Sequence, residues 1–224
     1  MSTKPKPGKD NFTRNLVIGV VVGVILIMLV PTLISKQTDT SAKIPASVSA
    51  ERGYGVVFNG ELTGVPVIDV YEDFQCPVCA QFEAAQGDYL ESLIAEKKAT
   101  VVFHTLSFIG TESVLAANAA ACSADEDKFL ALHKMLYQTQ PKENSGAWTN
   151  ESLVAAGNSV GITSDSYEKC VNTGQYAGWV NNVAAAAAQE DVNSTPTIFI
   201  NGKELKRGNE YYDRALCKAA VERG

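Results

Sequence analysis

Two cysteines separated by two residues stand in the segment Cys76-Pro77-Val78-Cys79. They directly follow a β-branched run over residues 65–71 and precede apolar residues at helical spacing. At the start of a helix, unpaired backbone N–H groups and the positive end of the helix dipole stabilise a thiolate. The motif therefore predicts dithiol–disulfide exchange, in which Cys76 attacks and Cys79 resolves a mixed disulfide.

Other uses of such a cysteine pair fit the chain less well. A zinc site needs two further ligands, and the sequence offers only His104, His133 and three scattered cysteines. Haem attachment needs a histidine after the second cysteine, where the chain has Ala80. An inert structural disulfide across so short a ring adds little stability. We therefore predict no metal and no organic cofactor, and interpret both histidines as core or surface residues.

The cysteine pair lies at a predicted strand-to-helix junction. Pro77 stands where the first residue of a helix tolerates proline, and the helical pattern continues to about Lys97. Residues 99–108 then read as a second strand. Strand, helix and strand together predict a parallel unit with a right-handed crossover.

A long stretch without a convincing strand follows this unit. Its pattern predicts helices over residues 111–121, 125–138, 151–159, 165–171 and 175–188. Asn150 and Ser164 are the expected N-caps of two of them. After this stretch, Thr197–Ile200 predicts a strand, Asn201-Gly202 a two-residue hairpin turn, and residues 209–222 a final helix.

An apolar stretch without a charged residue, Leu16–Ile34, is long enough to span a bilayer. Its length favours an uncleaved anchor over a cleaved signal peptide, whose apolar core has about 7 to 15 residues. Basic residues precede it, so residues 1–15 are expected in the cytoplasm and everything after about Lys36 outside. We therefore expect a single-pass protein of the cell membrane with an extracytoplasmic catalytic domain, where disulfides persist.

The net charge of −6 is unevenly distributed along the chain. Residues 1–36 hold five Lys or Arg residues and one acid, so the remainder of the chain is strongly acidic. Nucleic-acid binding draws most of its affinity from positive charge. The acidic globular part therefore argues against a nucleic-acid partner.

Four features, in this order, resemble the DsbA-like branch of the thioredoxin superfamily. They are the motif at the end of a strand, the helix after it with Gln81-Phe82-Glu83, a helical insertion, and Thr195-Pro196-Thr197 before the late hairpin. The resemblance covers about residues 55–223. Some actinobacterial members of the family carry a second, structural disulfide, and a disulfide within the insertion of this chain would be similar to it. The resemblance implies a thioredoxin-like α/β fold with an inserted helical domain.

The resemblance also implies how the active site is shaped. The peptide bond between Thr195 and Pro196 would be cis and would pack beside the cysteines. The backbone of Thr195 would pair with a substrate strand, and its hydroxyl would reach the sulfur of Cys76. Pro77, Val78, Thr195 and Pro196 are thus expected to form the substrate-facing surface.

The expected layout of the chain has five parts. They are a cytoplasmic segment (1–15), a transmembrane anchor (16–34), a flexible tether (35–54), a thioredoxin-like domain (55–110 and 190–224) and a helical insertion (111–189).

The expected activity is the introduction of disulfides into exported proteins that contain cysteines. The family implies reoxidation by a quinone-linked membrane oxidase of DsbB-like or VKOR-like type. Two alternatives stay open: a reductase or isomerase of the same fold, and a tethered binding protein or metal chaperone that uses the thiolates as ligands.

Two departures from the family pattern bear on the strength of the nucleophile. Val78 occupies the position where strongly oxidising members have a histidine, which predicts a weaker oxidant. Val70 stands six residues before the first cysteine, where thioredoxin-like folds commonly place a buried carboxylate. Asp69, Glu72 and Asp73 lie nearby, and one of them is either a proton relay or, like the others, a solvated acid at the end of a strand.

Three further cysteines lie in the second half of the chain. Cys122 and Cys170 both fall in helical segments of the insertion, and a disulfide between them would stabilise the fold by roughly 4 kcal/mol. We favour this pairing over the other combinations. Cys217, in the final helix, is then unpaired and is interpreted as a small buried apolar residue.

Overall fold

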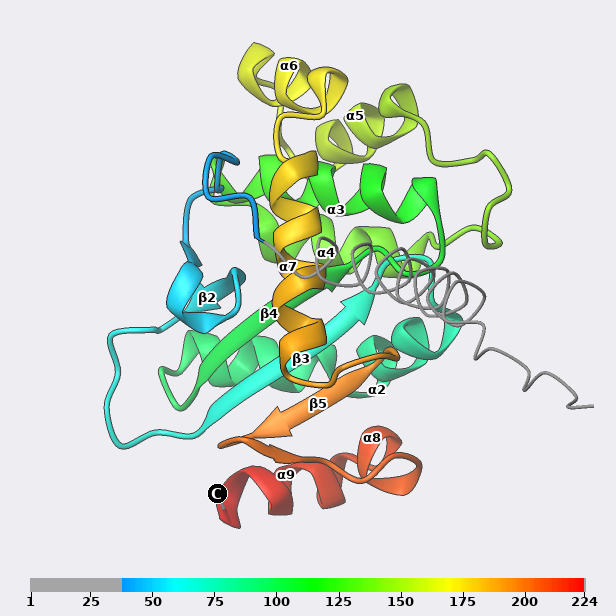
Figure 1. The fold of residues 1–224 in the computed structure, drawn as a ribbon. Helices are drawn as coiled ribbons and strands as arrows, with labels where there is room; N and C mark the ends of the chain where they lie inside the picture. Colours follow the sequence, from blue (N-terminus) through cyan, green and yellow to red (C-terminus); the bar gives the residue numbers. More distant parts are fainter. Residues whose placement is uncertain (1–37, 224) are drawn as a thin grey trace, which may run out of the picture. The chain divides into compact units, whose positions relative to one another are not determined.

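The computed structural model describes residues 38–223. At its centre lies a six-stranded sheet in the order β1-β2-β4-β3-β5-β6. The strands are β1 (Val48–Ser49), β2 (Gly55–Phe58), β3 (Val67–Asp73), β4 (Thr100–Leu106), β5 (Thr197–Ile200) and β6 (Lys203–Glu204). Strands β3 and β4 are parallel, whereas the other neighbouring pairs are antiparallel. The parallel unit that the sequence predicts therefore forms the middle of the sheet (Figure 1).

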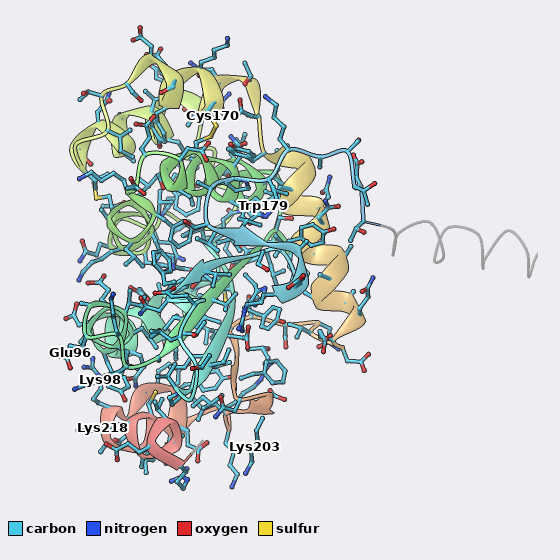
Figure 2. The ribbon with its side chains drawn as sticks, turned by 90° about the vertical axis from the view of Figure 1, so that its left-hand side faces the viewer. Glu96, Lys98, Cys170, Trp179, Lys203 and Lys218 are labelled. Carbon is cyan, nitrogen blue, oxygen red and sulfur yellow. A yellow bond between two sulfur atoms is a disulfide. The ribbon has the colours of Figure 1, made fainter. Side chains whose placement is uncertain are left out.

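Helices cover both faces of this sheet. They are α2 (Pro77–Ala95), α3 (Thr111–Ala124), α4 (Phe129–Gln138), α5 (Asn150–Ser159), α6 (Asp165–Thr173), α7 (Ala177–Gln189), α8 (Asn209–Tyr212) and α9 (Arg214–Arg223). Figures 1 and 2 show α7 on one face of the sheet and α2 on the other. Helices α3, α5 and α6 gather at one end of the sheet, and α8 and α9 at the opposite end. The chain thus has the α/β layers that the sequence predicts.

The central strands form because both of their faces are buried. Every residue of β4 is buried, and its β-branched and aromatic side chains suit a covered strand. Helix α2 follows β3 without a long loop and begins at Pro77, where proline costs no hydrogen bond. It ends before Lys97, which has a φ of 55°. The motif is therefore fixed between a buried strand and a long helix.

Most helix boundaries lie within a few residues of the sequence prediction, but the cap of α5 and the continuity of the final helix differ from it. The N-cap of α5 is Thr149, which forms a capping box with Ser152, and Asn150 is the first helical residue. Ser164 caps α6 as predicted, because its side chain accepts a hydrogen bond from the Tyr167 amide. The final helix is divided into α8 and α9 at Asp213, whose carboxylate accepts backbone hydrogen bonds from the start of α9.

Part of the expected tether is folded onto the domain. Residues 48–49 form β1, residues 50–52 form one turn of 3₁₀ helix, and Asp39 exchanges hydrogen bonds with Asn182 of α7. Helix α7 itself packs against β4, and its buried Trp179, labelled in Figure 2, donates a hydrogen bond to the Tyr54 carbonyl. The prediction of a flexible tether is therefore wrong over residues 38–54. Helix α7, which was expected to belong to the helical insertion, instead covers one face of the sheet.

The membrane-spanning prediction, Leu16–Ile34, lies outside the described residues. Within residues 38–223, no helix combines the length and the apolar character that a membrane crossing requires.

Candidate active site

Cys76 occupies the N-cap position of α2. Its backbone has extended angles, its amide donates to the Asp73 carbonyl at 2.9 Å, and its carbonyl accepts from the Ala80 amide at 3.2 Å. Cys76 and Cys79 are both free thiols in this structure. The helix start thus points unpaired N–H groups toward the first sulfur, as expected for an activated thiolate.

The pKa of Cys76 is lowered from 9.0 to about 6. The largest cause is a hydrogen bond from the Cys79 side chain, with further lowering by Thr195 and by the backbone amides of Val78 and Cys79; burial opposes them. A thiolate that accepts several hydrogen bonds is stabilised relative to the thiol. Cys76 is therefore largely a thiolate at neutral pH.

Cys79 has the opposite character. It is buried inside α2, and burial raises its pKa well above the ordinary value, with the charge of Cys76 acting in the same direction. The two sulfurs thus differ in protonation at neutral pH, with a deprotonated nucleophile at the helix start and a protonated thiol about one turn into the helix. That asymmetry is what an attacking and a resolving cysteine require.

Thr195 and Pro196 lie beside the motif, although they are distant in sequence. The peptide bond between them is cis, and the Cys76 thiol donates to the Thr195 carbonyl at an Sγ···O distance of 3.5 Å. Pro196 is buried, and its carbonyl accepts a hydrogen bond from the Tyr211 hydroxyl at 3.4 Å. This is the arrangement that the resemblance to the DsbA-like proteins implies.

The loop before the motif is held by side chains from the helical part of the chain. The Gln140 amide donates to the carbonyls of both Phe74 and Cys76, at 2.6 and 3.0 Å. Gln75 is buried, donates to Ser113 and accepts from the Asn144 amide at 2.6 Å. These contacts fix the position of the Cys76 backbone from a different element. Gln140 carries no sequence signal of this role, because no motif or local spacing ties it to the cysteines.

The three acids near the motif have three different environments. Asp69 pairs with the buried His104 at 3.1 Å. Asp73 is buried and accepts from the amides of Gln75 and Ile109, and burial raises its pKa. Glu72 is buried and lies 2.6 Å from His133 Nε2. Of the three, only Glu72 shares a strand face with Val70, which stands where thioredoxin-like folds commonly have a buried carboxylate. This chain therefore has a carboxylate on that face, two residues closer to the motif.

The exposed surface around the motif is apolar. Pro77 and Val78 are exposed while both cysteines are buried, and Phe108, which follows β4, is exposed as well. The next residue, Ile109, donates its amide to the Asp73 carboxylate, so Phe108 borders the motif loop. An apolar rim of this kind suits an extended or unfolded polypeptide as a substrate.

The remaining cysteines are accounted for in the folded domain. Cys122 of α3 and Cys170 of α6 form a disulfide, with Cα atoms 5.9 Å apart; Cys170 is labelled in Figure 2. This is the pairing favoured from the sequence. Cys217 is a buried free thiol in α9, and burial raises its pKa to about 11. Within residues 38–223, no group of three or more His, Cys, Asp or Glu side chains could hold a metal ion.

The fold and the site define a protein of the thioredoxin class. The Thioredoxin family model matches residues 54–216, which cover the motif, the helical part and the cis-proline. The chain belongs to this family, and it is a thiol–disulfide oxidoreductase of DsbA-like type.

Relatives and solved structures agree with this assignment. The chain is 28% identical over 195 residues to a Rickettsia typhi protein named as a protein-disulfide oxidoreductase, covering 84% of this chain and 67% of that protein. The solved structure of reduced DsbA from Mycobacterium tuberculosis is 26% identical, with a TM-score of 0.64 over 75% of this chain and 91% of that one. The thiol-disulfide oxidoreductase MdbA of Actinomyces oris has a TM-score of 0.69 at 23% identity, over 85% of this chain and 99% of that one, and supports the fold.

Proposed function

We propose that this chain introduces disulfides into exported proteins that contain cysteines, with Cys76 as nucleophile and Cys79 as resolving residue. The observation that carries the proposal is the environment of Cys76 at the start of α2, where hydrogen bonds from the Cys79 and Thr195 side chains and from backbone amides lower its pKa to about 6. Thiolate pKa values of about 7 and about 3.5 belong to thioredoxin and to strongly oxidising DsbA. A value between them supports an oxidant of intermediate strength, in keeping with valine at position 78.

The reaction follows from the two cysteine environments. A substrate thiolate attacks the Cys76 sulfur of the oxidised pair, forming a mixed disulfide and releasing Cys79. A second substrate thiolate then attacks the substrate sulfur of that mixed disulfide, so a substrate disulfide forms and Cys76 leaves with the electron pair. The low pKa of Cys76 makes it a good leaving group. The exposed Val78 and Phe108, with the backbone of Thr195, hold the substrate chain beside the sulfur.

The location and the redox partner belong to the same proposal. The apolar run Leu16–Ile34 and the basic residues before it support a single-pass anchor with the catalytic domain outside the cytoplasm. A quinone-linked membrane oxidase of DsbB-like or VKOR-like type would return the reduced cysteine pair to the disulfide. A periplasmic or surface reporter fused after residue 224 tests the topology; reporter activity confined to the cytoplasm would contradict it.

The reduction potential of the Cys76/Cys79 pair tests the direction of the reaction. A value near −120 to −180 mV supports net oxidation, whereas a value near that of thioredoxin, about −270 mV, assigns the chain to the reductases.

A Cys79→Ala variant tests the chemistry itself, because it should trap substrates as mixed disulfides with Cys76. If no mixed disulfide accumulates and the wild-type chain binds Cu(I) tightly, the metal-chaperone alternative replaces the enzyme.

A further inference from the structure

Two hydroxyl side chains flank the cis peptide between Thr195 and Pro196, and a single guanidinium contacts both of them. Ser194 precedes the peptide and Thr197 follows it; residues 194–197 are called the cis-proline loop below. Arg207 Nη2 donates to Ser194 Oγ at 2.6 Å and to Thr197 Oγ1 at 2.7 Å. The Thr197 hydroxyl in turn donates to the Ser194 carbonyl at 2.8 Å. One nitrogen of Arg207 therefore holds the loop at both of its ends.

The contacts to the two hydroxyls are the interactions that fix the Arg207 side chain. Arg207 lies in the segment between β6 and α8, and its side chain is half-exposed. Its Nε atom lies 3.6 Å from Glu204 Oε1, which is half-exposed as well. An ion pair in contact with solvent contributes little, whereas hydrogen bonds from a charged donor are among the stronger ones. The guanidinium is therefore held mainly by the cis-proline loop.

The same C-terminal segment supports the loop a second time through Tyr211 of α8. The Tyr211 hydroxyl donates to the Pro196 carbonyl at 3.4 Å, and its side chain is buried. The Tyr211 carbonyl accepts a hydrogen bond from the buried Gln86 side chain of α2 at 3.0 Å, and Arg214 donates to the same side chain at 3.0 Å. Helix α8 also packs against α2 (Figure 1). Residues 207–214 thus connect the cis-proline loop with the helix that carries both cysteines.

Thr195 is the residue of the loop that reaches the nucleophile. Its carbonyl lies 3.5 Å from Cys76 Sγ, and it is partly exposed, whereas Pro196 and Thr197 are buried. A substrate chain that pairs with the Thr195 backbone must bring its own sulfur into line with that of Cys76. A displacement of about 1 Å at such a site can cost about 100-fold in rate. The position of the loop therefore matters for a substrate that has a backbone to pair.

We propose that Arg207 is a positioning residue for thiol–disulfide exchange at Cys76. Its guanidinium holds the hydroxyls of Ser194 and Thr197, and thereby sets where Thr195 presents its backbone to a substrate chain. The proposal rests on the proposed function, since it concerns how a substrate chain is held beside the same sulfur. Arg207 makes and breaks no bond in the reaction and acts through the loop alone. Because the loop already has the conformation that pairs with the substrate, binding costs less conformational entropy.

The two contacts start from one nitrogen, which gives a direct choice of variants. Arg207→Met keeps an unbranched side chain and removes every donor. Arg207→Lys keeps three donors on one nitrogen, so an ammonium can replace both hydrogen bonds. Lys206→Met is the matched control, because Lys206 is exposed, carries the same charge, and contacts Glu210 through its backbone amide. The set separates loss of the hydrogen bonds from loss of a positive charge.

Two reductants of the oxidised full-length protein separate substrate positioning from the reactivity of the disulfide. One is a short unfolded peptide with two cysteines, which has a backbone to pair with Thr195; the other is dithiothreitol, which has none. Single-turnover rates with both are measured for each variant. Arg207→Met should react with the peptide about 10-fold more slowly, because two hydrogen bonds from a charged donor are lost, and with dithiothreitol within about twofold of wild type. Arg207→Lys should restore most of the peptide rate, and Lys206→Met should equal wild type in both reactions.

A milder variant keeps the test independent of folding. Ser194→Ala removes one of the two acceptors at a partly exposed position and should slow the peptide reaction about threefold. A peptide rate within about twofold of wild type in Arg207→Met would overturn the proposal, and so would an equal loss with peptide and dithiothreitol, which a purely structural role predicts. If the wild-type protein oxidises dithiothreitol but no peptide, the proposed function itself is refuted, and the role of Arg207 with it.

Discussion

The sulfur of Cys76 lies 3.5 Å from the backbone carbonyl of Thr195, which is 119 residues away in the sequence. The side chain of Thr195 also lowers the pKa of Cys76. One residue therefore acts on the nucleophile through two groups, its carbonyl toward the thiol and its hydroxyl toward the thiolate. The loop that carries Thr195 and the nucleophile Cys76 are thus coupled.

Replacing Thr195 by valine should raise the pKa of Cys76, because valine keeps the shape of the side chain and removes the hydroxyl. A hydrogen bond to a charged group contributes about 1.5 kcal/mol, which corresponds to about one pKa unit. Ultraviolet absorbance of the thiolate as a function of pH measures the change. Thr197→Val is the matched control, since its hydroxyl donates to the Ser194 carbonyl; an equal shift in both variants would contradict the assignment.

The reactivity of Cys76 toward an alkylating reagent should depend on pH with a midpoint near its pKa of about 6. Below that pH the thiolate is lost and the rate falls about tenfold for each pH unit. Cys79→Ala should move the midpoint upward, because the Cys79 side chain is the largest cause of the lowering. Mass spectrometry of the alkylated protein gives the rates. A wild-type midpoint at the ordinary thiol value of about 8.5 would show that the site does not activate Cys76.

Gln140→Leu should destabilise the reduced protein and displace Cys76, because the Phe74 carbonyl loses its donor and the Cys76 carbonyl keeps only the Ala80 amide. Leaving one buried carbonyl unsatisfied costs about 1 to 3 kcal/mol, which chemical denaturation can resolve. The reduction potential of the cysteine pair should change as well, since the Cys76 backbone is no longer held. Gln138→Leu, at an exposed neighbouring position, should leave both quantities unchanged. An unaltered potential in Gln140→Leu would limit this residue to a role in stability.

The stability of the oxidised protein should decline between about pH 6.5 and pH 9 because of His133. Its pKa in the folded state is raised from 6.5 to about 9 by the carboxylates of Glu72 and Glu83, against the effect of burial. A raised pKa gives stabilisation that is complete below the unfolded value and lost as pH rises through the folded one, up to about 3 kcal/mol here. The oxidised form is used because the Cys76 thiolate would titrate with the opposite sign.

Denaturation curves at several pH values, compared with Glu72→Gln, measure this contribution. That variant removes a carboxylate next to His133 and should flatten the decline. Glu61→Gln, at an exposed acid, should retain it. A decline of the same size in Glu72→Gln and wild type would show that the pair does not stabilise the imidazolium.

Removing the disulfide of the helical part with Cys122→Ala and Cys170→Ala should lower the free energy of unfolding by roughly 4 kcal/mol. The two cysteines are 48 residues apart, and a crosslink across such a separation restricts the unfolded chain. Cys217→Ala, which removes a buried cysteine outside any disulfide, should cost less. The pH midpoint for alkylation of Cys76 should stay the same in the double variant. The disulfide joins α3 to α6 and includes neither cysteine of the motif.

The parts of the site that follow from local sequence could be predicted. The position of Cys76 at a strand-to-helix junction depends on a β-branched strand and on Pro77, and both signals lie within a few residues of the motif. The asymmetry between Cys76 and Cys79 follows from the same helix start. The place of Thr195 beside them came from resemblance, since no local pattern connects residues so far apart.

The parts that depend on packing between distant elements could not be predicted. His133 reads as an ordinary helix residue, and only the packing of α4 onto β3 and α2 brings it to Glu72 and Glu83. The alternation of side chains along a strand did not distinguish Asp69, Glu72 and Asp73, because it does not show which face of the strand is covered by other elements. One local signal was available: Gly87 follows Glu83 by one helical turn, and a glycine inside a long helix indicates a close neighbour.

The disulfide between Cys122 and Cys170 is the same kind of bond that a thiol–disulfide oxidoreductase acts on. Each newly made copy carries a pair of thiols that must be oxidised before its helical part is crosslinked. Under the proposed function, the protein would therefore be both a source of disulfides in other chains and a client of the same chemistry. Mature copies would then oxidise later ones, and the onset of activity in a growing cell would depend on whichever oxidant treats the first chains.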